Sequence, residues 1–92
     1  MSENTKPDPA AAEKLYISRQ FIERSQALEL KGKKRDDALM NYLAGAANVL
    51  VFVHGEDSPI TKSFIGWMTF KVAFRGWNAI TEVVDEAALK GI

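Results

Sequence analysis

The sequence predicts an all-α fold, a small bundle of three main helices at about residues 9–31, 36–54 and 59–90. Apolar residues recur at helical spacing through each range, and glycine or proline lies at each boundary. The connections between the ranges are short, so consecutive helices are expected to run antiparallel. Residues 1–8 are polar and contain a proline, which predicts a disordered lead-in, and residues 9–92 are expected to form a single domain.

The first two helices have recognisable ends. Asp8 can cap the first helix with Pro9 at its first position, and Gly32 is expected to stop it. The second helix is apolar on nearly every side, which predicts a central position in the bundle, and it should end at His54 with Gly55 as a positive-φ cap. An alternative for this part of the chain is a buried β-branched strand at residues 49–54, paired with an alternating strand at 68–75.

The third helix should begin at Ser58 and Pro59, and its polar residues stay on one side at the helical period as far as residue 88. Strand alternation fails after Gly76, which favours the helix. A helix over residues 59–90 would be roughly 45 Å long, against roughly 30 Å for its neighbour. It must therefore overhang or break, and Gly66 is the predicted break because the apolar pattern changes phase there. Gly76 is predicted to stay helical.

Composition limits the classes of function. The 12 basic and 12 acidic residues cancel, which argues against a chain that mainly coats nucleic acid or an anionic membrane. The absence of cysteine excludes disulfides and thiolate metal sites, and it favours a cytoplasmic setting. The uncharged stretch 38–53 is shorter than the roughly 20 residues that span a bilayer, so a membrane-associated helical hairpin is the weakest alternative.

Catalytic chemistry is not predicted. The single histidine, His54, has no second histidine or cysteine to complete a metal site, and no phosphate-binding glycine motif is present. Glu82, Asp85 and Glu86 share a spacing that could hold a hard cation, although this pattern is more typical of a solvated helix face. The sequence therefore predicts no enzyme, no catalytic or metal-binding residue and no cofactor.

The densest charge feature is a basic run between the first two helices, formed by Lys31, Lys33, Lys34 and Arg35. This run is a possible polyanion contact. With Lys14, Arg19 and Arg24 it would make a nucleic-acid-associated module, the main alternative function. The adjacent Asp36 and Asp37 weaken its field, and no recognition helix follows, so nucleic acid is not the favoured partner.

The most informative pattern is a stripe of four large aromatic residues in the third helix, within roughly 80° of one another at helical spacing: Trp67, Phe70, Phe74 and Trp77. Lys71 and Arg75 border it. The first helix and the small residues at 44–47 could cover all four rings from within the chain. However, the apolar directions here exceed what two neighbouring helices bury, and large aromatic residues are frequent at binding hot spots.

The sequence therefore predicts a non-enzymatic protein–protein interaction module that forms a homodimer through this aromatic edge. A second protein is a further candidate partner. Adaptors, regulatory subunits and the small inhibitors that mobile elements often encode all fit this description, and the sequence does not choose among them.

Overall fold

The computed structural model describes residues 8–91, so the expected disordered lead-in lies outside the described residues except for Asp8, which is not helical. The described chain consists of helices and short turns without any strand, which confirms the all-α class and excludes the alternative strands at 49–54 and 68–75. The elements in order are α1 Pro9–Ala27, α2 Gly32–His54, α3 Pro59–Trp67, the π-helical turn η1 Met68–Val72, α4 Ala73–Arg75 and α5 Trp77–Leu89. Because α3, η1 and α4 follow one another without interruption, residues 8–91 build four helical rods rather than the predicted three.

The first connection lies earlier in the chain than the sequence predicts. Glu29 has a φ of +54°, and the Leu30 N–H donates to the Ser25 carbonyl at 2.9 Å, so α1 has already ended before residue 31. A hydrogen bond of this kind satisfies a carbonyl that the last helical turn leaves unpaired. The chain therefore reverses at Glu29, a non-glycine residue with left-handed backbone dihedral angles.

The second connection agrees with the sequence. α2 ends at His54, and Gly55, with a φ of +92°, donates its N–H to the Val51 carbonyl at 2.9 Å. Ser58 then caps α3, since its hydroxyl accepts a hydrogen bond from the Ile60 N–H at 3.3 Å. These local signals fix the turn between α2 and α3.

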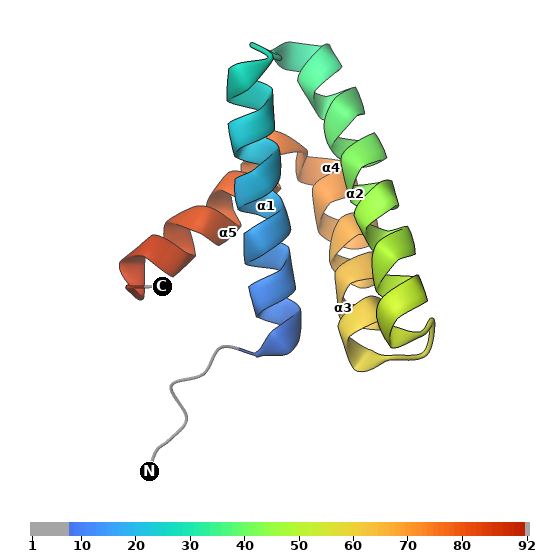
Figure 1. Cartoon of the computed structure of the whole chain (residues 1–92). Helices are drawn as coiled ribbons and strands as arrows, with labels where there is room; N and C mark the ends of the chain where they lie inside the picture. The colour runs from blue at the N-terminus through green and yellow to red at the C-terminus, as the bar shows by residue number, and fades with distance from the viewer. Residues whose placement is uncertain (1–7, 92) are drawn as a thin grey trace.

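The four rods place α1, rather than α2, in the middle (Figure 1). α1 lies between α2 and α5 and packs most extensively on α5 and α3, whereas α2 lies at an edge of the bundle and packs mainly on α3. The prediction of a central α2 was wrong because its apolar residues do not all face the core: Val49, Phe52 and Val53 are exposed. Gly45 also has no neighbouring atom within 4 Å of the place where a Cβ would stand, so no other helix approaches it closely.

The core draws on every rod. Phe21 of α1, Leu39 and Leu43 of α2, Phe64 of α3 and Ile80 of α5 are all fully or almost fully buried. Burial of each such side chain contributes about 1.5–3 kcal/mol to folding. The α2–α3 contact also includes a buried hydrogen bond, in which Thr61 Oγ1 donates to the Leu50 carbonyl at 3.3 Å. The one buried hydroxyl of α3 is thereby satisfied by a backbone acceptor of α2.

The π-helical turn η1 corrects the phase of the third rod. In a regular α-helix, Val72 would lie roughly 80° around the axis from Phe64. A π-turn advances the chain by a smaller angle per residue. Because the chain passes through η1 on the way from Phe64 to Val72, Val72 returns to the core side. There it is buried together with Phe64.

The break in the third helix is at Gly76, not at Gly66, so that prediction was wrong. Gly66 lies inside α3 with nothing within 4 Å of its Cβ position, whereas Gly76 has φ +56° and ψ −132°. Such a conformation is rare for residues with a side chain. Asp36, from the first turns of α2, lies beside Gly76, with Oδ1 3.1 Å from where a Cβ would stand. The turn sends α5 across α1, against which it packs (Figure 1).

We predict that the two glycines respond oppositely to alanine. Gly76→Ala should lower the free energy of unfolding by about 1–3 kcal/mol, because the side chain is strained at this φ and meets Asp36. Gly66→Ala should be neutral or stabilising by up to about 1 kcal/mol, because alanine favours a helix interior. Urea unfolding of both variants at one protein concentration, followed by circular dichroism, measures the difference. Equal effects would contradict a break at Gly76.

Candidate interaction surfaces

The structure separates the four rings of the predicted stripe. Trp67 and Trp77 are half-buried, whereas Phe70 is 77% exposed and Phe74 is 81% exposed. Trp67 packs on Phe64, with ring centroids 5.6 Å apart. The first helix and the small residues of α2 therefore do not cover all four rings from within the chain.

One irregularity of the backbone lies between each tryptophan and Phe74. The π-turn η1 lies between Trp67 and Phe74, and the Gly76 reversal lies between Phe74 and Trp77. Because a π-turn advances less per residue than an α-turn, Phe70 and Phe74 rotate away from the side on which Trp67 packs. The expected single edge of four rings therefore becomes a pair of rings that face solvent.

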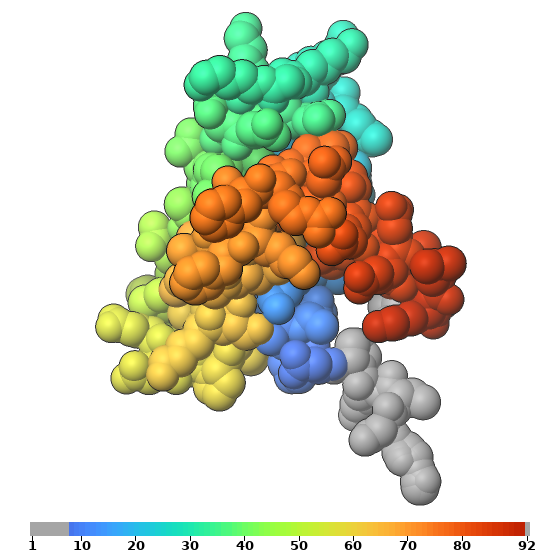
Figure 2. All heavy atoms as spheres, turned by 180° about the vertical axis from the view of Figure 1, so that it is seen from behind, coloured from blue at the N-terminus to red at the C-terminus, as the bar shows by residue number. Residues whose placement is uncertain are grey.

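The exposed rings are part of a continuous surface on the outer side of the rod formed by α3, η1 and α4. We name this surface the Phe70–Phe74 face, and its exposed members are Ile65, Thr69, Phe70, Ala73 and Phe74. Figure 2 shows this rod, in yellow and orange, crossing the middle of the molecule's other side. Phenylalanine is among the residue types most often buried, so two such rings one turn apart need an explanation.

Lys71 and Arg75 lie on the side of this face that adjoins α5. The Glu82 carboxylate pairs with both, at 2.9 Å from Arg75 Nη1 and 4.0 Å from Lys71 Nζ. All three groups are partly exposed, so each pair contributes little to stability. The Glu82 carboxylate thus balances one of the two basic charges beside the Phe70–Phe74 face.

The basic run at the start of α2 is divided between internal contacts and solvent. The Arg35 guanidinium lies over the Trp77 ring, with Cζ 4.0 Å from the ring centroid, and Arg35 Nε is buried without a hydrogen-bond partner among residues 8–91. Lys33 Nζ pairs with Asp37 at 3.0 Å, while Lys31 and Lys34 are exposed. The predicted polyanion contact therefore retains three exposed lysines, one of them paired with Asp37, while Arg35 packs on Trp77.

A second apolar patch lies at the groove between α1 and α2. Tyr16 and Val49 line this groove, and Phe52 and Val53 continue along the exposed side of α2. Phe52 is 91% exposed, but it is the only phenylalanine in the patch. It provides an internal comparison for the paired rings on the other surface.

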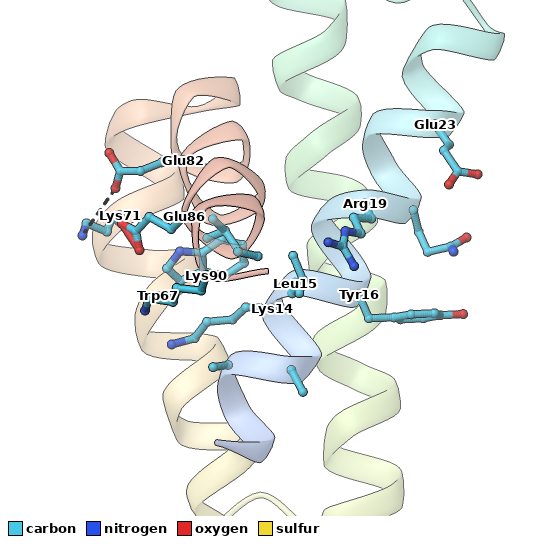
Figure 3. Close-up of a pocket in the computed structure, with 15 residues that line it drawn as sticks. Lys14, Leu15, Tyr16, Arg19, Glu23, Trp67, Lys71, Glu82, Glu86 and Lys90 are labelled. Carbon is cyan, nitrogen blue, oxygen red and sulfur yellow. Dashed lines mark ion pairs between the residues drawn. The ribbon is translucent and has the colours of Figure 1, made fainter. Parts of the chain in front are cut away.

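A cleft between α1 and α5 is the feature that sequence reasoning missed. It has a volume of about 490 Å³ and runs along α1 from Ala11 to Glu23, opposite residues 82–90 of α5. Trp67 and Lys71 of the third rod also line it (Figure 3). The cleft exists only because the Gly76 reversal brings α5 beside α1. In the sequence, helical periodicity assigns the residues of α5 to the third helix, so this cleft could not be predicted.

Other candidate groups form no site within the described chain. No cluster of three or more His, Asp or Glu side chains that could hold a metal ion occurs among residues 8–91. His54 is exposed at the end of α2, and Glu82 is held by Lys71 and Arg75. No helix within residues 8–91 is both long enough and apolar enough to cross a membrane.

Comparison of this chain with protein-family models, with curated proteins and with solved structures finds no match. Its function must therefore be inferred from its own surfaces.

The contact between Arg35 and Trp77 yields a stability prediction. Arg35→Ala should lower the free energy of unfolding by about 1–2 kcal/mol, because it removes a cation–π contact and uncovers the indole. Lys33→Ala is the matched control in the same run, and it should cost less than about 0.5 kcal/mol because its ion pair is exposed. Urea unfolding measures both values, and an equal, small loss for both variants would show that Arg35 does not hold Trp77.

Proposed function

We propose that this chain is a non-enzymatic protein–protein interaction module that forms a homodimer through the Phe70–Phe74 face. The observation that supports the proposal is the exposure of Phe70 and Phe74, 77% and 81%, on adjacent turns of one rod. Burial of a phenylalanine side chain contributes about 1.5–3 kcal/mol, and aromatic rings are among the main contributors to binding at interfaces. Two rings from each copy would supply most of the association energy.

The charges around the face favour a second copy of the chain as the partner. Lys62 lies on α3 before Ile65, at one end of the face, while Asp36 lies beside Gly76 at the other end. A two-fold axis brings opposite ends of the same surface together. Lys62 of each copy would then approach Asp36 of the other copy, and this pairing would favour self-recognition.

The nucleic-acid alternative has less support. Arg35 is engaged by Trp77, Lys33 by Asp37, and Lys71 and Arg75 by Glu82. Affinity for a polyanion depends on the number of cations that are free to neutralise phosphates. As an interaction module the chain would act as an adaptor, a regulatory subunit or a small inhibitor in the cytoplasm, and a second protein could use the same face.

The test is sedimentation equilibrium of the full chain. The wild type is expected to dimerise in the micromolar range, and Phe70→Ser with Phe74→Ser should weaken the dimer at least tenfold. Circular dichroism should show unchanged helix content, because substitutions at exposed positions change stability little. Phe52→Ser is the matched control, since it removes an equally exposed ring from the α2 surface and should leave the dimer intact.

Two results would contradict the proposal. If the wild type remains monomeric at high micromolar concentration, the chain does not form the proposed homodimer. A dimer that is lost in Phe52→Ser but retained in the Phe70→Ser and Phe74→Ser double variant would place the interface on α2.

A further inference from the structure

We infer that the cleft between α1 and α5 binds a single-chain amphiphile with an anionic head group, of the long-chain carboxylate class. This site is distinct from the Phe70–Phe74 face, and the inference does not depend on dimerisation. It follows from the dimensions of the cleft, from the apolar side chains in its lining and from the lysines that line it.

The shape of the cleft suits an extended chain. Its volume of about 490 Å³ lies within the range of small-molecule sites, roughly 300–1,000 Å³. It follows α1 over the residues between Ala11 and Glu23, which corresponds to roughly 18 Å of helix. Figure 2 shows the molecule hollowed between α1, in blue, and the projecting α5, in red. A long and narrow ligand fits such a space better than a compact one.

The cleft has a mixed lining, and its apolar side chains come from three separate rods. Leu15 and Ala11 line it from α1, Val83 and Ala87 line it from α5, and Trp67 contributes its half-buried ring from the end of α3. Burial of each methylene group against such side chains contributes about 0.8 kcal/mol. A hydrocarbon chain would therefore gain affinity where it lies against these five residues.

The lining carries four basic residues and three carboxylates, so its charge favours an anionic head group. Lys14 from α1 and Lys90 from the end of α5 line opposite walls, and neither has an ion pair within residues 8–91. Figure 3 shows Lys14 extending from α1 toward the side of the cleft that holds Trp67. The acidic Glu82 is already paired with Lys71 and Arg75, which leaves Glu86 and Glu23 as the remaining carboxylates of the lining.

A lysine is suited to this position because its two parts have different preferences. The methylene stem packs along apolar surface while the ammonium group stays at the mouth of the site, where it can pair with a carboxylate. Two lysines on opposite walls would hold one carboxylate between them, with the hydrocarbon chain against Leu15, Val83 and Trp67. A cationic amphiphile of the same length would lack this pairing.

The test is a titration of the isotopically labelled full chain with dodecanoate below its micelle concentration. The indole N–H signal of Trp67, assigned with a Trp67→Phe variant, should shift and saturate, while the Trp77 signal should change little. Dodecyltrimethylammonium, which has the same chain and the opposite charge, should bind at least tenfold more weakly. Vesicles of anionic phospholipid distinguish the source of the ligand: binding to dodecanoate alone assigns a free carboxylate, and binding to both assigns a lipid head group as well.

Matched variants test the residues. Lys14→Glu with Lys90→Glu should weaken dodecanoate binding at least tenfold, and Lys31→Glu with Lys34→Glu, which makes the same charge change on exposed lysines outside the cleft, should not. Lys14→Gln with Lys90→Gln repeats the test with a smaller change if the first variant loses helix content. The Phe70→Ser and Phe74→Ser double variant should bind dodecanoate normally, so failure of the dimer and failure of this site are distinguishable.

Three results would overturn the inference. They are the absence of a saturable shift at Trp67, equal affinity for the cationic amphiphile, and an equal loss of binding in the control lysine variant.

Discussion

The reversal of the chain at Gly76 is the constraint on which the rest of this structure depends. A glycine at φ +56° ends the third rod. The Asp36 carboxylate lies beside it, with Oδ1 3.1 Å from where any larger residue would have its Cβ. Arg35, the neighbour of that aspartate, covers the ring of Trp77 immediately after the turn. Two consecutive residues at the start of α2 therefore hold the first residues of α5, and the Asp36 carboxylate stands at the positive end of the α5 dipole.

Two consequences follow from this single turn. α5 packs against α1, so Ile80 and Ala79 complete the core. The two helices leave a cleft between them, which Trp67 borders. The exposure of Phe70 and Phe74 has a separate cause, because the π-turn η1 rotates them away from the side on which Trp67 packs. The core and the cleft thus have a common structural cause.

The sequence predicted what local chemistry determines and missed what tertiary contacts determine. The helix ends at His54 and Ser58 were predictable because a positive-φ glycine and a serine cap act within a few residues. The change of apolar phase near Gly66 was a real feature, but the chain accommodates it by the π-turn at Met68–Val72 and not by a break. The break at Gly76 does not change the hydrophobic periodicity, because the polar side of residues 71–86 continues at the helical period through this residue.

The candidate surfaces could likewise be predicted only in part from the sequence. Aromatic content and spacing identified the segment that carries the exposed rings, but periodicity could not show that each tryptophan turns inward across a π-turn or a glycine. Arg35 belonged to a run of similar cations, and only its position over Trp77 distinguishes it from Lys33. The α1–α5 cleft depends on residues that are far apart in the sequence, and no spacing rule brings them together.

Hydroxyl-radical footprinting over a range of protein concentrations tests the central claim, that the exposed rings of Phe70 and Phe74 form the interface between two copies. Trypsin cleavage after Lys71 and Arg75 places Phe70 and Phe74 in separate peptides, and Phe52 lies in a third. The account predicts that oxidation of Phe70 and Phe74 is high at low concentration and falls as the protein associates, while oxidation of Phe52 stays constant. Unchanged oxidation of Phe70 and Phe74 across the transition to dimer would contradict it.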